Sequence, residues 1–297
     1  MPIKMIECPR DAMQGWKTFI PTEYKAKYIN QLLKIGFDTL DFGSFVSPKA
    51  IPQMRDTAEV LKKLDFSHSE TKLLAIVANQ RGVEEASQFE EIAYLGYPLS
   101  ISERFQLRNT HKTIAKSFAG LDAMQNAALK HDKQMVVYLS MGFGNPYGEP
   151  WSIAILAEWA ERLIKKGIRI IALSDTIGVS QREDITAIYK TLVPQYPQVE
   201  FGAHLHSRPE TWREKIDAAY QAGCRRFDTT IKGFGGCPMA KDVLVGNMPT
   251  EKVVQYMGEK KVASKLDKRE FECAYALSKR IFTTDFDPLA EAMRQEY

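Results

Sequence analysis

Residues 168–206, IRIIALSDTIGVSQREDITAIYKTLVPQYPQVEFGAHLH, contain a complete strand–helix–strand unit. Two short apolar runs, residues 168–175 and 199–206, are typical of buried strands and flank a helical pattern over residues 182–195. A helix between two strands predicts that the strands lie parallel in one sheet, because the helix carries the chain back to the starting edge. The stretch therefore indicates a parallel α/β fold.

The same alternation extends along the chain on both sides of this unit. The other strand candidates are residues 3–8, 37–43, 72–79, 97–102, 134–141 and 224–231. The other helical stretches are residues 22–34, 51–63, 83–92, 109–131, 150–166 and 210–222, with 250–261 and 268–282 after the last strand. Eight such units predict an α/β fold of the (β/α)8 TIM barrel type with extra C-terminal helices. We expect one catalytic domain over residues 1–285 and a polar tail over residues 286–297.

Composition excludes several classes of partner. The net charge of the 297 residues is only +3, and no basic run is interleaved with aromatic residues, so we expect no nucleic-acid partner. No stretch approaches the roughly 18 apolar residues of a membrane span. The four cysteines form no Cys-x-x-Cys pair, and the first residues contain no apolar signal core. These features together lead us to expect a cytoplasmic protein with reduced thiols.

Reactive side chains gather where the predicted strands end, which is where barrels of this kind place their chemistry. His204 and His206 are two apart on a strand, so both side chains face the same way. Asp11 follows the first strand and could reach the same place, and Asn247 after the last strand could add an amide oxygen. This mixed set suits magnesium or manganese, and zinc fits by ligand type alone. The alternative is a buried, hydrogen-bonded histidine pair.

Residues 233–247, GFGGCPMAKDVLVGN, place Cys237 in a glycine-rich loop. Glycines permit positive φ angles and loop motion, so Cys237 could be carried to a substrate rather than buried as a core thiol. Two other residues also have structural alternatives. Arg10 could form a salt bridge at the barrel rim, and Asp175 could cap the helix that follows it.

Five motifs in this order carry a family resemblance. They are PRDAMQ at residues 9–14, SFVSPKAIPQM at 44–54, SDTIGV at 174–179, HLH at 204–206 and the glycine-rich loop at 233–247. With them the chain resembles the 3-hydroxy-3-methylglutaryl-CoA (HMG-CoA) lyases, part of a metal-dependent barrel group that includes the isopropylmalate and citramalate synthases. The resemblance implies a homodimer, an acyl-CoA thioester substrate and a divalent metal. The implied metal ligands are Asp11, His204, His206 and Asn247.

The implied reaction is cleavage of HMG-CoA to acetyl-CoA and acetoacetate. In such a cleavage the substrate hydroxyl loses a proton, a carbon–carbon bond breaks, and the departing thioester enolate is stabilised and protonated. The resemblance makes Arg10 and Cys237 catalytic, Arg10 at the enolate oxygen and Cys237 as proton donor. Asp41 and Asp175 could orient Arg10 or relay protons. The general base stays open among Asp11, Asp175 and His204.

Three departures from the family pattern leave the identity of the substrate's acyl group open. Asp41 stands where the lyases have glutamate, residues 207–212 read SRPETW where they have DTYGQ, and Ala12-Met13 replaces Gly-Leu. A closely related 3-hydroxyacyl-CoA is therefore a second possible substrate. The alternative hypotheses for the function are a synthase that condenses an acyl-CoA with a 2-oxo acid, and a barrel that binds a ligand without catalysis.

Overall fold

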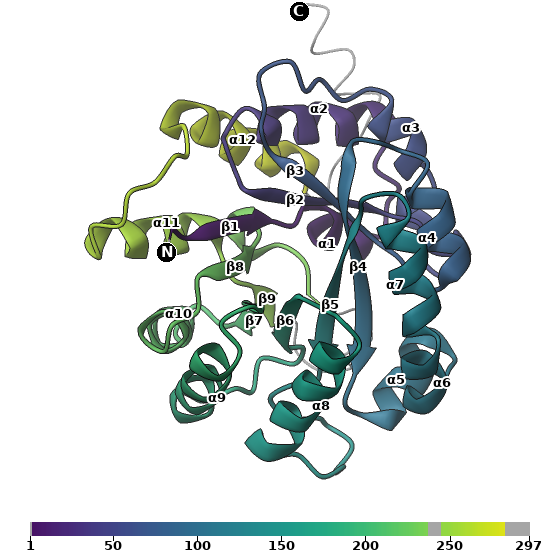
Figure 1. The fold of residues 1–297 in the computed structure, drawn as a ribbon. Helices are drawn as coiled ribbons and strands as arrows, with labels where there is room; N and C mark the ends of the chain where they lie inside the picture. The colour runs from purple at the N-terminus through teal and green to yellow at the C-terminus, as the bar shows by residue number, and fades with distance from the viewer. Residues whose placement is uncertain (1, 237–244, 283–297) are drawn as a thin grey trace, which may run out of the picture.

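A computed structural model describes residues 2–236 and 245–282, and over these residues the barrel prediction is confirmed (Figure 1). Eight parallel strands pair in chain order, and pairing of β1 with β8 and of β6 with β7 closes the sheet. The strands are β1 (Lys4–Glu7), β2 (Thr39–Ser44), β3 (Lys72–Ile76), β4 (Ile92–Ser100), β5 (Gln134–Ser140), β6 (Ile170–Asp175), β7 (Glu200–Ser207) and β8 (Arg226–Thr229). The expected boundary between residues 285 and 286 lies outside the described residues.

Helices surround the barrel and most of them cover the outer face of its strands, whereas α1 lies at the strand ends (Figure 1). They are α1 (Pro9–Gln14), α2 (Thr22–Leu33), α3 (Thr57–Leu61), α4 (Gln80–Ala86), α5 (Glu103–Thr110), α6 (Ile114–Ala119), α7 (Leu121–Leu129), α8 (Ile153–Lys165), α9 (Arg182–Gln195), α10 (Trp212–Gln221), α11 (Thr250–Glu259) and α12 (Lys268–Ile281), with short 3₁₀ turns η1 (Pro52–Met54) and η2 (Ile231–Gly233). The two helices after β8, α11 and α12, are the extra C-terminal helices that the sequence predicts.

Four elements differ clearly from the expectation. The helix expected over residues 109–131 is divided among α5, α6 and α7. Helix α5 ends before His111, which is in the left-handed conformation, the Thr113 hydroxyl caps the start of α6, and α7 begins after Gly120. The helix expected over 51–63 is divided into η1 and α3. Strand β4 begins at residue 92 rather than 97, and the helix before it, expected over 83–92, spans 80–86.

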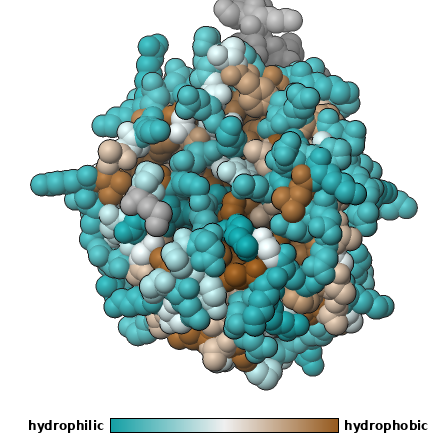
Figure 2. All heavy atoms as spheres, viewed as in Figure 1, coloured by the Kyte–Doolittle hydropathy of each residue, from teal (hydrophilic) through white to brown (hydrophobic). Residues whose placement is uncertain are grey.

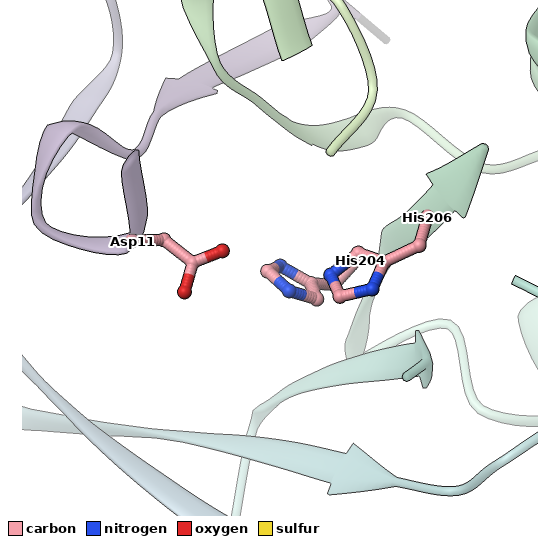
Figure 3. Close-up of side chains that lie close together, drawn as sticks. All are labelled: Asp11, His204 and His206. Atoms are coloured by element: carbon pink, nitrogen blue, oxygen red, sulfur yellow. The ribbon is translucent and has the colours of Figure 1, made fainter. Parts of the chain in front are cut away.

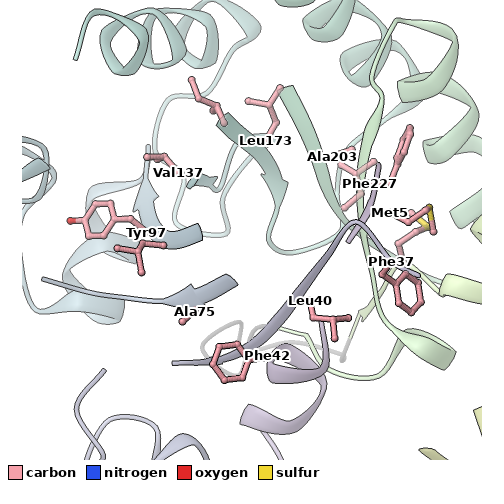
Figure 4. Packing of buried hydrophobic residues seen from close by; sticks show 14 of the residues in the cluster. Met5, Phe37, Leu40, Phe42, Ala75, Tyr97, Val137, Leu173, Ala203 and Phe227 are labelled. Atoms are coloured by element: carbon pink, nitrogen blue, oxygen red, sulfur yellow. The ribbon is translucent and has the colours of Figure 1, made fainter. Parts of the chain in front are cut away.

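Alternation along the strands separates two apolar layers. Side chains such as Val137, Leu173 and Phe227 belong to the larger core of buried residues, which packs the strands against the helices (Figure 4). Their neighbours Val136 and Ala172 belong to a second cluster with Leu74, Tyr138 and Ile170. Since adjacent strand residues face opposite ways, this second cluster fills the inside of the barrel.

The two ends of the segment after β8, near Thr230 and Thr250, are hydrogen-bonded to each other and to the barrel. Thr230 N–H donates to the Met248 carbonyl, and Thr250 N–H donates to the Thr230 carbonyl, each at 3.0 Å. The buried carboxyl group of Glu7 spans the same two ends, with Oε1 2.8 Å from Ile231 N and Oε2 2.5 Å from the Thr250 hydroxyl. A two-residue strand, β9 (Gly246–Asn247), then pairs antiparallel with the end of β7.

The surface is largely hydrophilic on the face viewed in Figure 2, where hydrophobic atoms form small, separated patches. Within the described residues, no helix is both long enough and apolar enough to cross a membrane.

Candidate metal centre

Asp11, His204 and His206 come together at the carboxyl ends of the strands, as the sequence predicts. One potential ligand atom from each lies within 4.8 Å of those of the other two. Figure 3 shows the Asp11 carboxylate on α1 pointing toward the two imidazoles on β7. Asp11 and His206 are buried and His204 is nearly so, which means that the group is shielded from bulk water.

Hydrogen bonds orient both imidazoles. His206 Nδ1 lies 2.9 Å from the carbonyl oxygen of Thr176, and because a carbonyl can only accept, Nδ1 carries the proton. Its Nε2 is buried and has no hydrogen-bond partner among the described residues. A buried lone pair of this kind is what a metal ion requires of a histidine ligand, so the residues present fit a metal. His204 Nδ1 lies 3.1 Å from Asp228 Oδ2, so Nε2 is the ring nitrogen that is available to a metal.

The charges in the group are mutually dependent. Burial, reinforced by His204, lowers the pKa of His206 to about 4, so this imidazole is neutral near pH 7. Burial alone would lower the pKa of His204, but Asp228 outweighs it and the pKa is raised. Burial would likewise raise the pKa of Asp11, yet Arg10 and the two histidines hold it below its ordinary value. The site therefore pairs a carboxylate with a neutral imidazole, both suited to a divalent cation.

Asn247 reaches the same centre from β9. It is paired with His206 across the two strands, and its Nδ2 donates to Asp11 Oδ2 at 2.6 Å and to the Phe234 carbonyl at 3.0 Å. In this arrangement the amide holds the carboxylate in place. Direct ligation through its oxygen stays a prediction.

Arg10 lies between two carboxylates. Its Nε is 3.1 Å from both oxygens of Asp41, its Nη2 is 2.5 Å from Asp41 Oδ2, and its Nη1 is 3.1 Å from Asp11 Oδ1. Burial alone would lower the pKa of Arg10, but Asp41 and Asp11 outweigh it and raise the pKa. The shorter side chain of Asp41 thus still orients the guanidinium, which stays cationic next to the candidate metal group.

Asp175 lies in a different network. Its Oδ1 accepts the Val179 N–H at 2.9 Å, and its Oδ2 accepts from Ser180 and from the Lys215 ammonium at 2.6 Å. These contacts fix the turn after β6 and do not include Arg10. They give Asp175 a structural role in this turn rather than the expected one as cap of α9, whose N-cap residue is Gln181, and a catalytic role for Asp175 stays a prediction.

Cys237 lies outside the described residues, but the glycines before it do not. Gly233, Gly235 and Gly236 all have positive φ. At Gly235 an added Cβ would lie 2.5 Å from the backbone oxygen of Asp11, so only glycine lets the loop approach the metal ligand this closely. The other thiols are buried (Cys8, Cys224) or exposed on α12 (Cys273).

Sequence reasoning assigned no role to three contributors to the site: Gln14, Thr176 and Asp228. Gln14 donates to Asp11 Oδ1 at 2.5 Å, and Thr176 offers only its backbone to His206. Asp228 had a readable signal, because it alternates with Arg226 on a strand that borders the histidine strand. A backbone carbonyl leaves no such signal in a sequence.

The fold and site define a (β/α)8 barrel with a candidate divalent-metal centre at the carboxyl ends of its strands. The chain belongs to the HMGL-like family, which matches residues 4–277. It is 34% identical to the hydroxymethylglutaryl-CoA lyase YngG of Bacillus subtilis, over 84% of this chain and 83% of that protein. It is 32% identical to the mitochondrial hydroxymethylglutaryl-CoA lyase of Rattus norvegicus, over 85% of this chain and 77% of that one.

Solved structures give the same result. An HMG-CoA lyase from Acinetobacter baumannii, in complex with coenzyme A and 3-methylmalate, superposes with a TM-score of 0.87 at 30% identity, covering 98% of this chain and 95% of that one. The Bacillus subtilis HMG-CoA lyase gives a TM-score of 0.87 at 29% identity, covering 99% and 100%. The resemblance read from the sequence motifs is thereby confirmed.

Proposed function

We propose that the protein is a divalent-metal-dependent carbon–carbon lyase that cleaves HMG-CoA to acetyl-CoA and acetoacetate. Family membership and the named relatives support the reaction class. The observation that carries the proposal is the largely buried group of Asp11, His204 and His206. Among the described residues the Nε2 of His206 has no partner, and Arg10 donates to Asp11.

Asp11, His204 and His206 would hold the metal, and Asn247 would complete the set. Oxygen donors together with imidazole favour manganese or magnesium over zinc. When bound, the metal would lower the pKa of the substrate hydroxyl and fix its geometry. Asp11 is kept ionised by Arg10, so it is also a candidate to receive the hydroxyl proton.

Arg10 has the charge and rigidity to stabilise the enolate oxygen of the departing thioester. Asp41 and Asp11 engage three of its nitrogens, and this fixes the plane of the guanidinium before the substrate arrives. Cleavage releases acetoacetate as a ketone, and the enolate carbon then takes a proton to become acetyl-CoA. Cys237 is the proposed donor of that proton.

The acyl specificity and the assembly follow the same relatives. The Acinetobacter baumannii lyase binds coenzyme A and 3-methylmalate, which supports a CoA-linked hydroxy acid as the substrate class. Asp41 in place of glutamate and SRPETW at residues 207–212 leave a related 3-hydroxyacyl-CoA as an alternative acyl group. We further propose a cytoplasmic homodimer.

The test is product formation from HMG-CoA by the purified protein with manganese and a thiol reductant. We expect acetyl-CoA and acetoacetate in equal amounts, and loss of both on adding a chelator. A parallel reaction with acetyl-CoA and a set of 2-oxo acids, followed by free CoA release, checks for condensation. CoA release there, without HMG-CoA cleavage, would identify a synthase, and silence in both reactions would indicate a barrel that only binds.

A further inference from the structure

Asp228 lies inside the barrel beneath the metal ligands. It is on β8 and buried. Its neighbour Phe227 belongs to the core between the strands and the helices (Figure 4), so Asp228 faces the inside of the barrel. Strands β7 and β8 pair Ala203 with Phe227, and the next positions along are His204 and Asp228. The strand register, rather than a flexible loop, therefore sets the contact between these two side chains.

Two contacts hold the His204 ring. On one side, Asp228 Oδ2 lies 3.1 Å from Nδ1. On another, the Tyr138 ring meets the imidazole edge to face, with centroids 5.4 Å apart. A carboxylate can only accept from Nδ1, so it favours the tautomer in which Nε2 has the free lone pair. The Tyr138 ring limits rotation about the side chain.

Arg226 supplies the balancing charge for Asp228. It is two residues away on the same inward face of β8, and it is almost completely buried. One of its nitrogens, Nη1, donates to Glu200 Oε1 at 3.0 Å. Its Nε and Nη2, like Asp228 Oδ1 and the Tyr138 hydroxyl, have no hydrogen-bond partner among the described residues. Burial alone would lower the pKa of Arg226, but Asp228 outweighs it and raises the pKa, so the guanidinium keeps its charge beside Asp228.

We propose that Asp228 is a positioning residue of the metal centre, which fixes the tautomer and orientation of His204 so that Nε2 faces Asp11. The inference rests on the metal site of the proposed function. Carboxylates that hold a metal-binding histidine typically contribute about 10- to 100-fold to metal affinity. A carboxylate with only a structural role would affect folding. Loss of Asp228 should instead change the manganese affinity and the tautomer of His204 even in a folded protein.

The experiment compares the parent with Asp228→Asn and Asp228→Ala. Manganese affinity is measured by titration with detection of free Mn²⁺ by electron paramagnetic resonance. The tautomer of His204 is read from ¹⁵N shifts in metal-free, histidine-labelled protein, which is practical because the chain has five histidines. Asp56→Asn is the control, since it removes another interior carboxylate, one that is paired with Lys25 away from the site.

We expect Asp228→Asn to weaken manganese binding about tenfold and Asp228→Ala by up to about 100-fold, with Asp56→Asn close to the parent. We also expect His204 in both Asp228 variants to lose its uniform Nδ1–H signature. Folded Asp228 variants that bind manganese within about twofold of the parent would overturn the inference, and Asp228→Asn suffices if the alanine variant does not fold. A parent that binds no manganese contradicts the proposed function instead, and the ¹⁵N shifts then decide the role of Asp228 alone.

Discussion

His206 and Asn247 are paired residues in the antiparallel contact between β7 and β9. One is on a barrel strand and the other is at the end of the glycine-rich segment, so closing that segment onto the barrel brings Asn247 to the metal ligands. From there its amide reaches Asp11 on α1. The candidate centre is thus assembled from α1, β7 and β9, all of which must be in place for it to exist.

Replacing His206 with alanine should abolish tight manganese binding and activity together. The reason is that Nε2 of His206 is buried with no partner in the described part of the chain, and a metal ion is the partner that the site is suited to hold. Calorimetric titration with manganese and an acetyl-CoA release assay provide the two measurements. His131→Ala, at an exposed position, is the control and should behave as the parent. Retention of parental manganese affinity by His206→Ala would show that the site is assigned wrongly.

Arg10→Lys should reduce kcat by about 100- to 1,000-fold, the usual loss when a donor to a developing oxyanion is removed. Lysine keeps the charge, but its single ammonium cannot meet Asp41 and Asp11 in the fork geometry of a guanidinium. Steady-state kinetics on HMG-CoA measure the effect. Arg213→Lys, whose exposed ion pair with Glu259 lies elsewhere, should leave kcat unchanged. Equal rates for Arg10→Lys and the parent would remove Arg10 from the mechanism.

Cys237→Ser should lower activity by about 100- to 10,000-fold while leaving metal affinity and thermal stability near parental values. A hydroxyl is almost the same size as a thiol but is a far weaker acid, so it replaces packing without replacing proton donation. Cys273→Ser, on the exposed face of α12, is the matched control. Near-parental turnover by Cys237→Ser would mean that sulfur does not deliver the proton.

Stability should fall with rising pH because of Glu7. Burial raises its pKa from 4.5 to about 8. Between these values the folded protein keeps a proton that the unfolded chain has released, so the contribution is complete below about pH 4.5 and is lost by about pH 8. Glu7→Gln, which stays neutral, should therefore gain stability relative to the parent across this range, on the order of a few kcal/mol.

Urea unfolding at pH 5, 6.5 and 8 measures this difference between variant and parent. Glu59→Gln is the control, since Glu59 is exposed on α3 and pairs with Lys62 near it in the chain. Parallel pH profiles for Glu7→Gln and the parent would show that Glu7 is already ionised when folded.

The barrel and the core of the site were predictable because their signals are periodic. Alternating residues place His204 and His206 on one strand face, and the order of strands brings Asp11 beside them. The boundaries around β4 were less predictable, since apolar residues between 83 and 92 suit a helix and a strand equally. Ser102 and Thr113 are residue types that commonly cap helices, but the helical periodicity around Thr113 continues without a break and favoured one long helix.

The surroundings of the site were not predictable to the same degree. Asp175 and Asp228 are both aspartates at the ends of barrel strands, yet one contacts Lys215 and the other His204. Which of these contacts forms depends on strand register and on which face each side chain occupies. The same applies to β9, because two residues are too few to show a periodic pattern.

The fastening of the segment after β8 has a consequence for how such barrels can diversify. Glu7, Thr230 and Thr250 hold the two ends together on the barrel side, independently of how many residues lie between them. Lengthening a closed segment costs little entropy, about 0.6 kcal/mol for each doubling. Insertions there should change the reach of Cys237 without displacing Asn247 from His206. The segment can therefore serve as an exchangeable cassette, through which the fold could accept larger acyl groups while its metal ligands stay fixed.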